Sequence, residues 1–249
     1  MKKIAIIATL PAFLLAFWSV LTGSGLIDPI FLPPPLDVGK SIISGFVNGT
    51  MLKDLGVTLW RALAGFALSA VIGIPLGLIV GRFKIIAAAT QPTFDFFRSI
   101  PATALFPLFL FLFGLGDKAK ISIVVYACSL VVLVNTAYGA LQVKKARILS
   151  AQVIGASRWD IFWMIVIPES APGIFAGLRV ALSMSFVLII VTEMFIGTTV
   201  GLGHQIIDSQ MVYRIPDMYA GIVLTGMAGY TVNCCLLALE RKLLHWVGK

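Results

Sequence analysis

The chain has 249 residues, of which 59% are hydrophobic and only 12% charged, and its mean hydropathy is +1.00. A soluble domain carries roughly 25% charged residues, so this composition excludes an ordinary water-soluble globule and predicts an integral membrane protein. The net charge of +8 does not indicate a nucleic-acid partner, because the basic residues lie in short clusters between apolar runs and not on one soluble face.

The N-terminal stretch is an apolar run over residues 4–21 that follows two lysines. This pattern is typical of a signal peptide or of a first transmembrane helix. Its length of about 18 residues and the lack of a small-residue cleavage motif favour the transmembrane helix. We therefore expect residues 1–54 to form a first transmembrane helix and a periplasmic proline-rich loop, followed by a core domain over residues 55–249.

Within the loop over residues 27–55, Pro33, Pro34 and Pro35 follow one another. Three successive prolines predict an extended segment and not a helix. A short amphipathic helix at the membrane surface is expected over residues 41–46.

The second span is expected over residues 55–80 and carries Gly73 and Gly77 in a G-x-x-x-G pattern. This spacing lets two helix backbones approach closely. We expect the close contact to lie within the chain in preference to a contact between two copies.

The next segment contains three prolines, which favours a short interfacial helix followed by a third span from about residue 101 to 113. Asp95 and Arg98 lie three positions apart in the interfacial helix, so their side chains should face each other.

Three further spans follow, over residues 121–143, 172–196 and 217–246, and a glycine-rich loop over residues 197–216 precedes the last of them. Pro172 suits the first turn of a helix, where its missing N–H costs nothing. The chain is thus predicted to be all-α, a polytopic membrane protein with about six transmembrane helices.

Charged and polar residues within spans usually face the protein interior or a water-filled path. Glu193 is expected to pair with a cation or to accept hydrogen bonds from backbone amides, with gating as the alternative role. Arg179 is expected to reach the cytoplasmic side or to pair with Asp95 or Glu169. The candidates for a pathway or a gate are Glu193, Arg98, Asn135 and Ser183, although Ser and Asn also join helices to one another. No spacing of Cys and His predicts a metal site or a catalytic nucleophile.

The positive-inside rule orients the six spans. With both termini in the cytoplasm, the inner positions collect more basic residues than the outer loops. The inner set is Lys2, Lys3, Arg82, Lys84, Lys144, Lys145, Arg147, Arg158, Arg241, Lys242 and Lys249, and the outer set is Lys40, Lys53, Lys118, Lys120 and Arg214. This orientation places the polar and aromatic insert over residues 149–168 in the cytoplasm.

We interpret the insert as two short helices, over residues 148–154 and 157–167, separated by a turn with a positive φ angle at Gly155. Ser157 is predicted to cap the second helix, with Asp160 at the N3 position completing a capping box.

Pro168 is expected to close the insert. Within it, an apolar stripe is predicted by the helical spacing of Trp159, Phe162, Trp163 and Val166. The stripe fits either a helix that lies on the bilayer surface or a helix that docks in the groove of a cytoplasmic partner.

The insert resembles the cytoplasmic loop of permease subunits of bacterial ATP-binding-cassette (ABC) importers, whose pattern is E-A-A, three residues, G, and an I-x-L-P ending. Ser150 and Ala151 stand at the two alanine positions, Gly155 is the glycine, Pro168 ends the pattern, and Leu149 replaces the glutamate. The resemblance extends from about residue 55 to the C-terminus. Within the family, the chain is most similar in these runs to the nitrate, sulfonate and taurine branch. Further matching runs are Gly155-Ala156-Ser157-Arg158-Trp159, residues 172–179, Arg98-Ser99-Ile100-Pro101, Phe113-Gly114-Leu115-Gly116, Glu193-Met194-Phe195 and Gly201-Leu202-Gly203.

The resemblance implies the type I ABC importer permease fold in the bacterial inner membrane, in contact with lipid. It implies two cytoplasmic ATP-binding subunits, which hold ATP and Mg, a second permease copy in a homodimer, and an extracytoplasmic substrate-binding protein. This chain would then bind no cofactor and catalyse no reaction of its own. The loop over about residues 146–168 would couple it to the ATPase through Ser150, Ala151, Gly155, Ala156, Ser157, Arg158, Trp159, Asp160 and Pro168. The substrate would be a small anion of the nitrate, sulfonate or taurine type or a related small organic compound. One alternative is a permease of the same branch for a pyrimidine- or flavin-type vitamin precursor. Another alternative is that the chain is a stand-alone secondary transporter.

Overall fold

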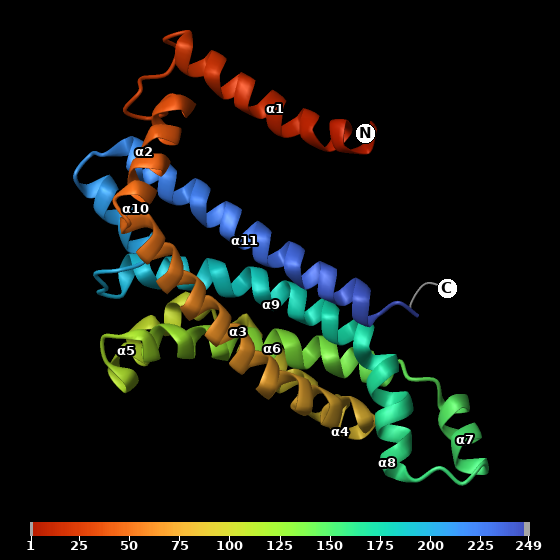
Figure 1. The fold of residues 1–249 in the computed structure, drawn as a ribbon. Helices are drawn as coiled ribbons and strands as arrows, with labels where there is room; N and C mark the ends of the chain where they lie inside the picture. Colours follow the sequence, from red (N-terminus) through yellow and green to blue (C-terminus); the bar gives the residue numbers. More distant parts are fainter. Residues whose placement is uncertain (1, 247–249) are drawn as a thin grey trace.

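The computed structural model describes the backbone of residues 2–246 and the side chains of residues 9–246. The described part is helical, without strands, which confirms the all-α prediction (Figure 1). Its helices are α1 (Lys2–Gly23), α2 (Pro35–Val47), α3 (Thr50–Arg82), α4 (Lys84–Ser99), the 3₁₀ turn η1 (Ala102–Leu105), α5 (Phe106–Phe113), α6 (Asp117–Leu141), α7 (Lys145–Val153), α8 (Arg158–Ile161), the π turn η2 (Phe162–Val166), α9 (Ile167–Phe195), α10 (Leu202–Met211) and α11 (Ile215–Leu243).

The core is built from α3, α6 and α9, with α6 packed against the other two. Small residues allow the close approach. A Cβ atom on Gly77 would lie 2.5 Å from the carbonyl oxygen of Leu133, and one on Gly73 would lie 2.8 Å from Cβ of Val132. The G-x-x-x-G pattern therefore packs within the chain, as expected, and serves the interhelical contact for which small residues are used in membranes.

Four helices among the described residues are long and apolar enough to cross a membrane: α3, α6, the continuous helix Arg158–Phe195, and α11. A fifth crossing is available if α4 and Ala102–Phe113 together make one bent span. The described apolar part of α1, Thr9–Gly23, is shorter. The number of spans is thus close to the six expected, and α1 forms the predicted helix.

The third span differs from its prediction. Ala102–Phe113 is 12 residues long by its bounds, which is about 18 Å of helix and too short for a hydrocarbon core of about 30 Å. It meets α4 at an angle of 77°. Pro101 explains the break, because a proline disfavours helical backbone in the residue before it, and Ile100 is extended with φ −77° and ψ 118°. Asp95 and Arg98 do face each other on α4, at 3.8 Å.

The second half of the insert also differs. Pro168 does not close it, and the fifth span does not begin at Pro172, because α8, η2 and α9 form one continuous helix (Figure 1). In η2 the Ile167 N–H donates to the carbonyl of Phe162, five residues back. This wider turn comes just before Pro168, and such turns and prolines are the usual causes of a bend within a helix.

Two further segments are more helical than expected. The surface helix α2 begins at Pro35, so only Pro33 and Pro34 stay outside it; proline suits the first turn because its missing N–H is not needed there. The glycine-rich loop after the fifth span contains α10.

Figure 1 shows two ends of the molecule. We call the end that carries α7 and α8 the hairpin end, and the end that carries α2, α10 and the turn between α5 and α6 the cluster end. The expected inner basic residues Arg82, Lys144 and Arg241 close or follow helices at the hairpin end, whereas Lys40 and Lys118 lie on helices at the cluster end. The two sets of basic residues are therefore separated along the molecule, as the orientation argument requires.

Candidate functional site

The hairpin formed by α7 and α8 is built by local signals. Helix α7 ends in a Schellman motif, in which the Ala156 N–H donates to Ala151 O at 3.0 Å and the Gly155 N–H donates to Gln152 O at 3.0 Å. The motif needs a left-handed residue, and Gly155 has φ +84°, as predicted.

The next helix starts with the predicted capping box. The Asp160 N–H donates to Ser157 Oγ at 3.1 Å, and the Ser157 N–H donates to Asp160 Oδ2 at 3.0 Å. Two backbone N–H groups that a helix start would leave unpaired are satisfied. The turn between α7 and α8 is therefore defined by short-range hydrogen bonds and does not depend on the rest of the fold.

The tip of this hairpin is apolar and exposed. Val153 is 86% exposed, Ile154 84% and Trp159 67%. The rings of Trp159 and Trp163 lie 5.7 Å apart in an edge-to-face arrangement, which is a favourable geometry for aromatic pairs. Exposed apolar surface of this kind, on a projecting element, marks a site of interaction with another protein or a membrane.

An ion pair and a hydrogen bond connect the base of the hairpin to α9. Arg147 of α7 donates to Glu169 of α9 at 2.5 Å, and the Lys144 N–H donates to the same carboxylate at 3.1 Å. Glu169 thus pairs with Arg147 and not with Arg179. Arg179 instead pairs with Glu240 of α11, which corrects both partners expected for it.

The structure brings eight of the nine predicted coupling residues together around the Gly155 turn: Ser150, Ala151, Gly155, Ala156, Ser157, Arg158, Trp159 and Asp160. Pro168 is separate from the tip. It lines a groove of about 750 Å³ at the base of the hairpin together with Ser150, Met164 and Trp246.

The four pathway candidates do not converge. Arg98 is half-exposed on α4 beside Asp95, and Ser183 donates to Arg179 O within its own helix at 3.3 Å. Asn135 donates to Val131 O, also within its own helix, at 2.9 Å. Among the described residues the hydrogen bonds of both side chains stay within their own helices, although Asn135 packs against Gly177 of α9.

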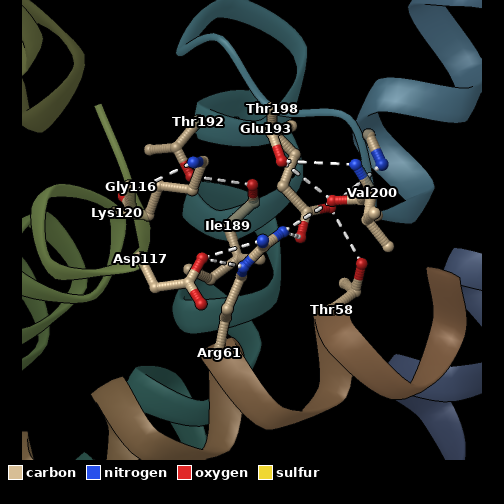
Figure 2. Close-up of polar contacts among 12 residues, drawn as sticks. Thr58, Arg61, Gly116, Asp117, Lys120, Ile189, Thr192, Glu193, Thr198 and Val200 are labelled. Atoms are coloured by element: carbon tan, nitrogen blue, oxygen red, sulfur yellow. Dashed lines mark hydrogen bonds and ion pairs between the residues drawn. The ribbon is translucent and has the colours of Figure 1, made fainter. Parts of the chain in front are cut away.

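Glu193, by contrast, lies at the centre of a buried ion cluster at the cluster end (Figure 2). Its side chain is 0% exposed. The carboxylate accepts hydrogen bonds from Arg61 Nη1 at 2.7 Å, Thr58 Oγ1 at 2.8 Å and the Gly203 N–H at 3.1 Å. Both structural expectations for Glu193, a cation and a backbone amide, are confirmed.

Arg61 ties the cluster to two further segments. Its Nε donates to Asp117 at the start of α6 at 2.8 Å, and its Nη1 donates to Val200 O at 2.8 Å. The buried Lys120 lies beside it and donates weakly to Gly116 O at 3.4 Å (Figure 2). The cluster therefore joins α3, α6, α9 and the segment before α10, and buried charges of this kind are retained only where they are paired.

Our reading of the sequence missed Arg61 and Thr58, although a signal was present. Arg61 is a charge inside the apolar run of the second span, and such a charge normally faces an internal partner. Gly201 also has a role here, because a Cβ atom at this position would collide with the Glu193 carboxylate.

The sequence matches, over residues 73–247, the family described as "Binding-protein-dependent transport system inner membrane component". The taurine transport system permease protein TauC of Escherichia coli is 30% identical over 248 residues, covering 98% of this chain and 90% of its own length. The nitrate import permease protein NrtB of Synechocystis is 30% identical over 239 residues, covering 92% and 85%. Among solved structures, inward-facing conformations of the MetNI methionine ABC transporter are similar with a TM-score of 0.68 and 17% identity over 78% of this chain and 96% of that one; at this identity the likeness shows the fold alone.

Proposed function

Because the chain belongs to the family of inner membrane components of binding-protein-dependent transport systems, we propose that its exposed α7–α8 tip is where a cytoplasmic ATPase subunit docks. The chain itself is a multi-pass membrane protein and the permease subunit of an ABC importer. Neither the vitamin-precursor reading nor the stand-alone transporter reading is favoured by these relatives.

The observation that carries the docking proposal is the apolar tip. Val153 and Ile154 come directly before the left-handed Gly155 and are the most exposed large apolar side chains of the hairpin. A rigid turn with apolar side chains on a projecting helix pair fits the groove of a partner protein. The two separate ATPase subunits would bind ATP and Mg, and this chain would bind neither.

The motion that this docking would drive is alternating access. The base of the hairpin is tied to α9 through the Arg147–Glu169 pair, and α9 carries Glu193 at its far end. A pull on the tip would therefore act on a helix that runs continuously to the cluster end, and rocking of packed helices is a known type of domain closure.

We further propose a homodimer with both termini in the cytoplasm. The pathway would lie between the two copies, and an extracytoplasmic binding protein would deliver the substrate to the cluster end. The substrate class we propose is a small oxoanion, because taurine, with its sulfonate group, and nitrate name the transport systems of the two relatives.

The docking proposal predicts that Val153→Asp and Ile154→Asp remove the ATPase subunit during co-purification. A buried carboxylate without a partner costs several kcal/mol, which is enough to lower retention by at least about tenfold. Leu26→Asp is the matched control, since Leu26 is 78% exposed and lies in the loop after α1. If the ATPase subunit stays bound to both hairpin variants at the level of the control, the tip is not the docking site.

A further inference from the structure

A second polar feature lies at the cluster end and is separate from the buried ion cluster. It is a cavity of about 290 Å³ between α2, α3, α10 and α11. Most of its lining is polar and includes Ser44, Asp54, Ser209, Arg214 and Asp217.

One polar side chain of the lining is buried and has no protein partner. Ser209 is 1% exposed, and its hydroxyl makes no hydrogen bond among the described residues. A buried polar group left unpaired costs about 1–3 kcal/mol, so this hydroxyl favours an occupant with a hydrogen-bonding group.

The charges of the lining residues favour a positively charged occupant. Asp54 and Asp217 contribute two carboxylates, whereas Arg214 is the single basic residue of the lining. Arg214 is shared, since it lies 3.6 Å from Asp217 and 3.5 Å from Asp208. The lining therefore carries one more negative than positive charge, which suits an ammonium or guanidinium group.

The cavity is connected to the buried cluster by one hydrogen bond. Asp54 Oδ1 accepts from the Gly201 N–H at 2.8 Å, and Gly201 packs directly against the Glu193 carboxylate. A cation that binds at Asp54 would therefore lie one residue away from the contacts that hold α3, α6 and α9 together.

We propose that this cavity receives a single Lys or Arg side chain of the extracytoplasmic binding protein when that protein docks. The inference rests on the proposed function, which places the cluster end outside the cell. The cavity is lined by α2 and α10, two short helices at that end (Figure 1), and its volume suits one side chain. A free small amine would present a similar cationic group and is the competing occupant of the cavity.

The test compares two charges at one lining position, in the complete transporter with its ATPase subunits in lipid vesicles. Ser44 is exposed and lines the cavity. Ser44→Lys places a resident ammonium in it, and Ser44→Glu adds an acceptor of similar size. We expect Ser44→Lys to raise the binding-protein concentration needed for half-maximal stimulation of ATP hydrolysis by about tenfold or more, and Ser44→Glu to leave it within about threefold.

The matched control is Ile43→Lys and Ile43→Glu, because Ile43 is 67% exposed on the same helix but does not line the cavity; both should stay near the unmodified protein. An equal loss in the two Ser44 variants, or a larger loss with Ser44→Glu, overturns the proposal.

A second arm separates the two sources of the cation. Ser44→Cys is labelled with a cationic thiol reagent in the presence of either the binding protein or n-butylammonium. Protection of the cysteine from labelling by the binding protein supports the proposal. Protection by n-butylammonium alone assigns the cavity to a free amine and overturns the assignment to the binding protein. ATP-driven uptake by the unmodified transporter is measured first, so that failure of the proposed function is seen separately.

Discussion

At the scale of single residues, the most consequential contact is the ion pair between Arg61 and Glu193. The two side chains are 6% and 0% exposed and lie 132 positions apart in the chain, on α3 and α9. Each has additional hydrogen bonds that satisfy its remaining polar atoms. The buried charges of the pair are therefore satisfied by protein partners. Removing one member would leave the other charge buried without its counter-ion.

Arg61→Leu should destabilise the protein by about 3–5 kcal/mol, because it leaves the Glu193 carboxylate buried without its cation. Arg61→Leu combined with Glu193→Leu should recover part of that loss, since no buried charge of the pair remains unpaired. Denaturant unfolding in detergent measures both. A double variant as unstable as the sum of the two single variants would show that the residues are not coupled.

At the scale of elements, the α7–α8 hairpin shows how short-range signals build a projecting structure. The Schellman motif at Gly155 and the capping box at Ser157 each involve residues no more than five positions apart. These signals were readable in the sequence. The extent of the second helix was not, because Pro168 normally indicates an end and here follows a π turn inside a continuous helix.

Gly155→Pro should abolish co-purification of the ATPase subunit and uptake, because proline requires φ near −65° and Gly155 has φ +84°. Gly155→Asn is the matched variant that should keep both, since asparagine tolerates the left-handed region. Retention of the ATPase subunit and uptake by Gly155→Pro would contradict the assignment of the hairpin. Equal loss with Gly155→Asn would show that the backbone angle is not what matters.

At the scale of the whole molecule, the exposed hairpin tip, which we propose as the docking site, lies at one end and two charged sites lie at the other. The core helices α3, α6 and α9 connect the ends, and α9 belongs to a helix that begins in the hairpin and ends beside the ion cluster. This continuous helix links the two ends of the molecule directly.

The proposed orientation, with both termini in the cytoplasm, predicts which end of the molecule a reagent can reach from outside the cell. Asp37→Cys, on α2, should react with a membrane-impermeant thiol reagent in intact cells, and Ile154→Cys should react only after the membrane is opened. The physical reason is the excess of basic residues at the hairpin end. The unmodified protein sets the background from Cys128, Cys234 and Cys235, and the reverse labelling pattern would invert the topology.

The amino-acid sequence was enough to predict the membrane class, the helical fold, the approximate number of spans, the Gly155 turn and the Ser157 cap. These features depend on composition and on hydrogen bonds between near neighbours, which the order of residues specifies directly. Helix packing was needed to reveal that Arg61 pairs with Glu193, that Arg179 pairs with Glu240, and that the 102–113 segment is part of a bent pair. Those partners come together from distant positions because the helices pack in one particular arrangement, and several cations in the sequence were equally available to each carboxylate until packing selected one.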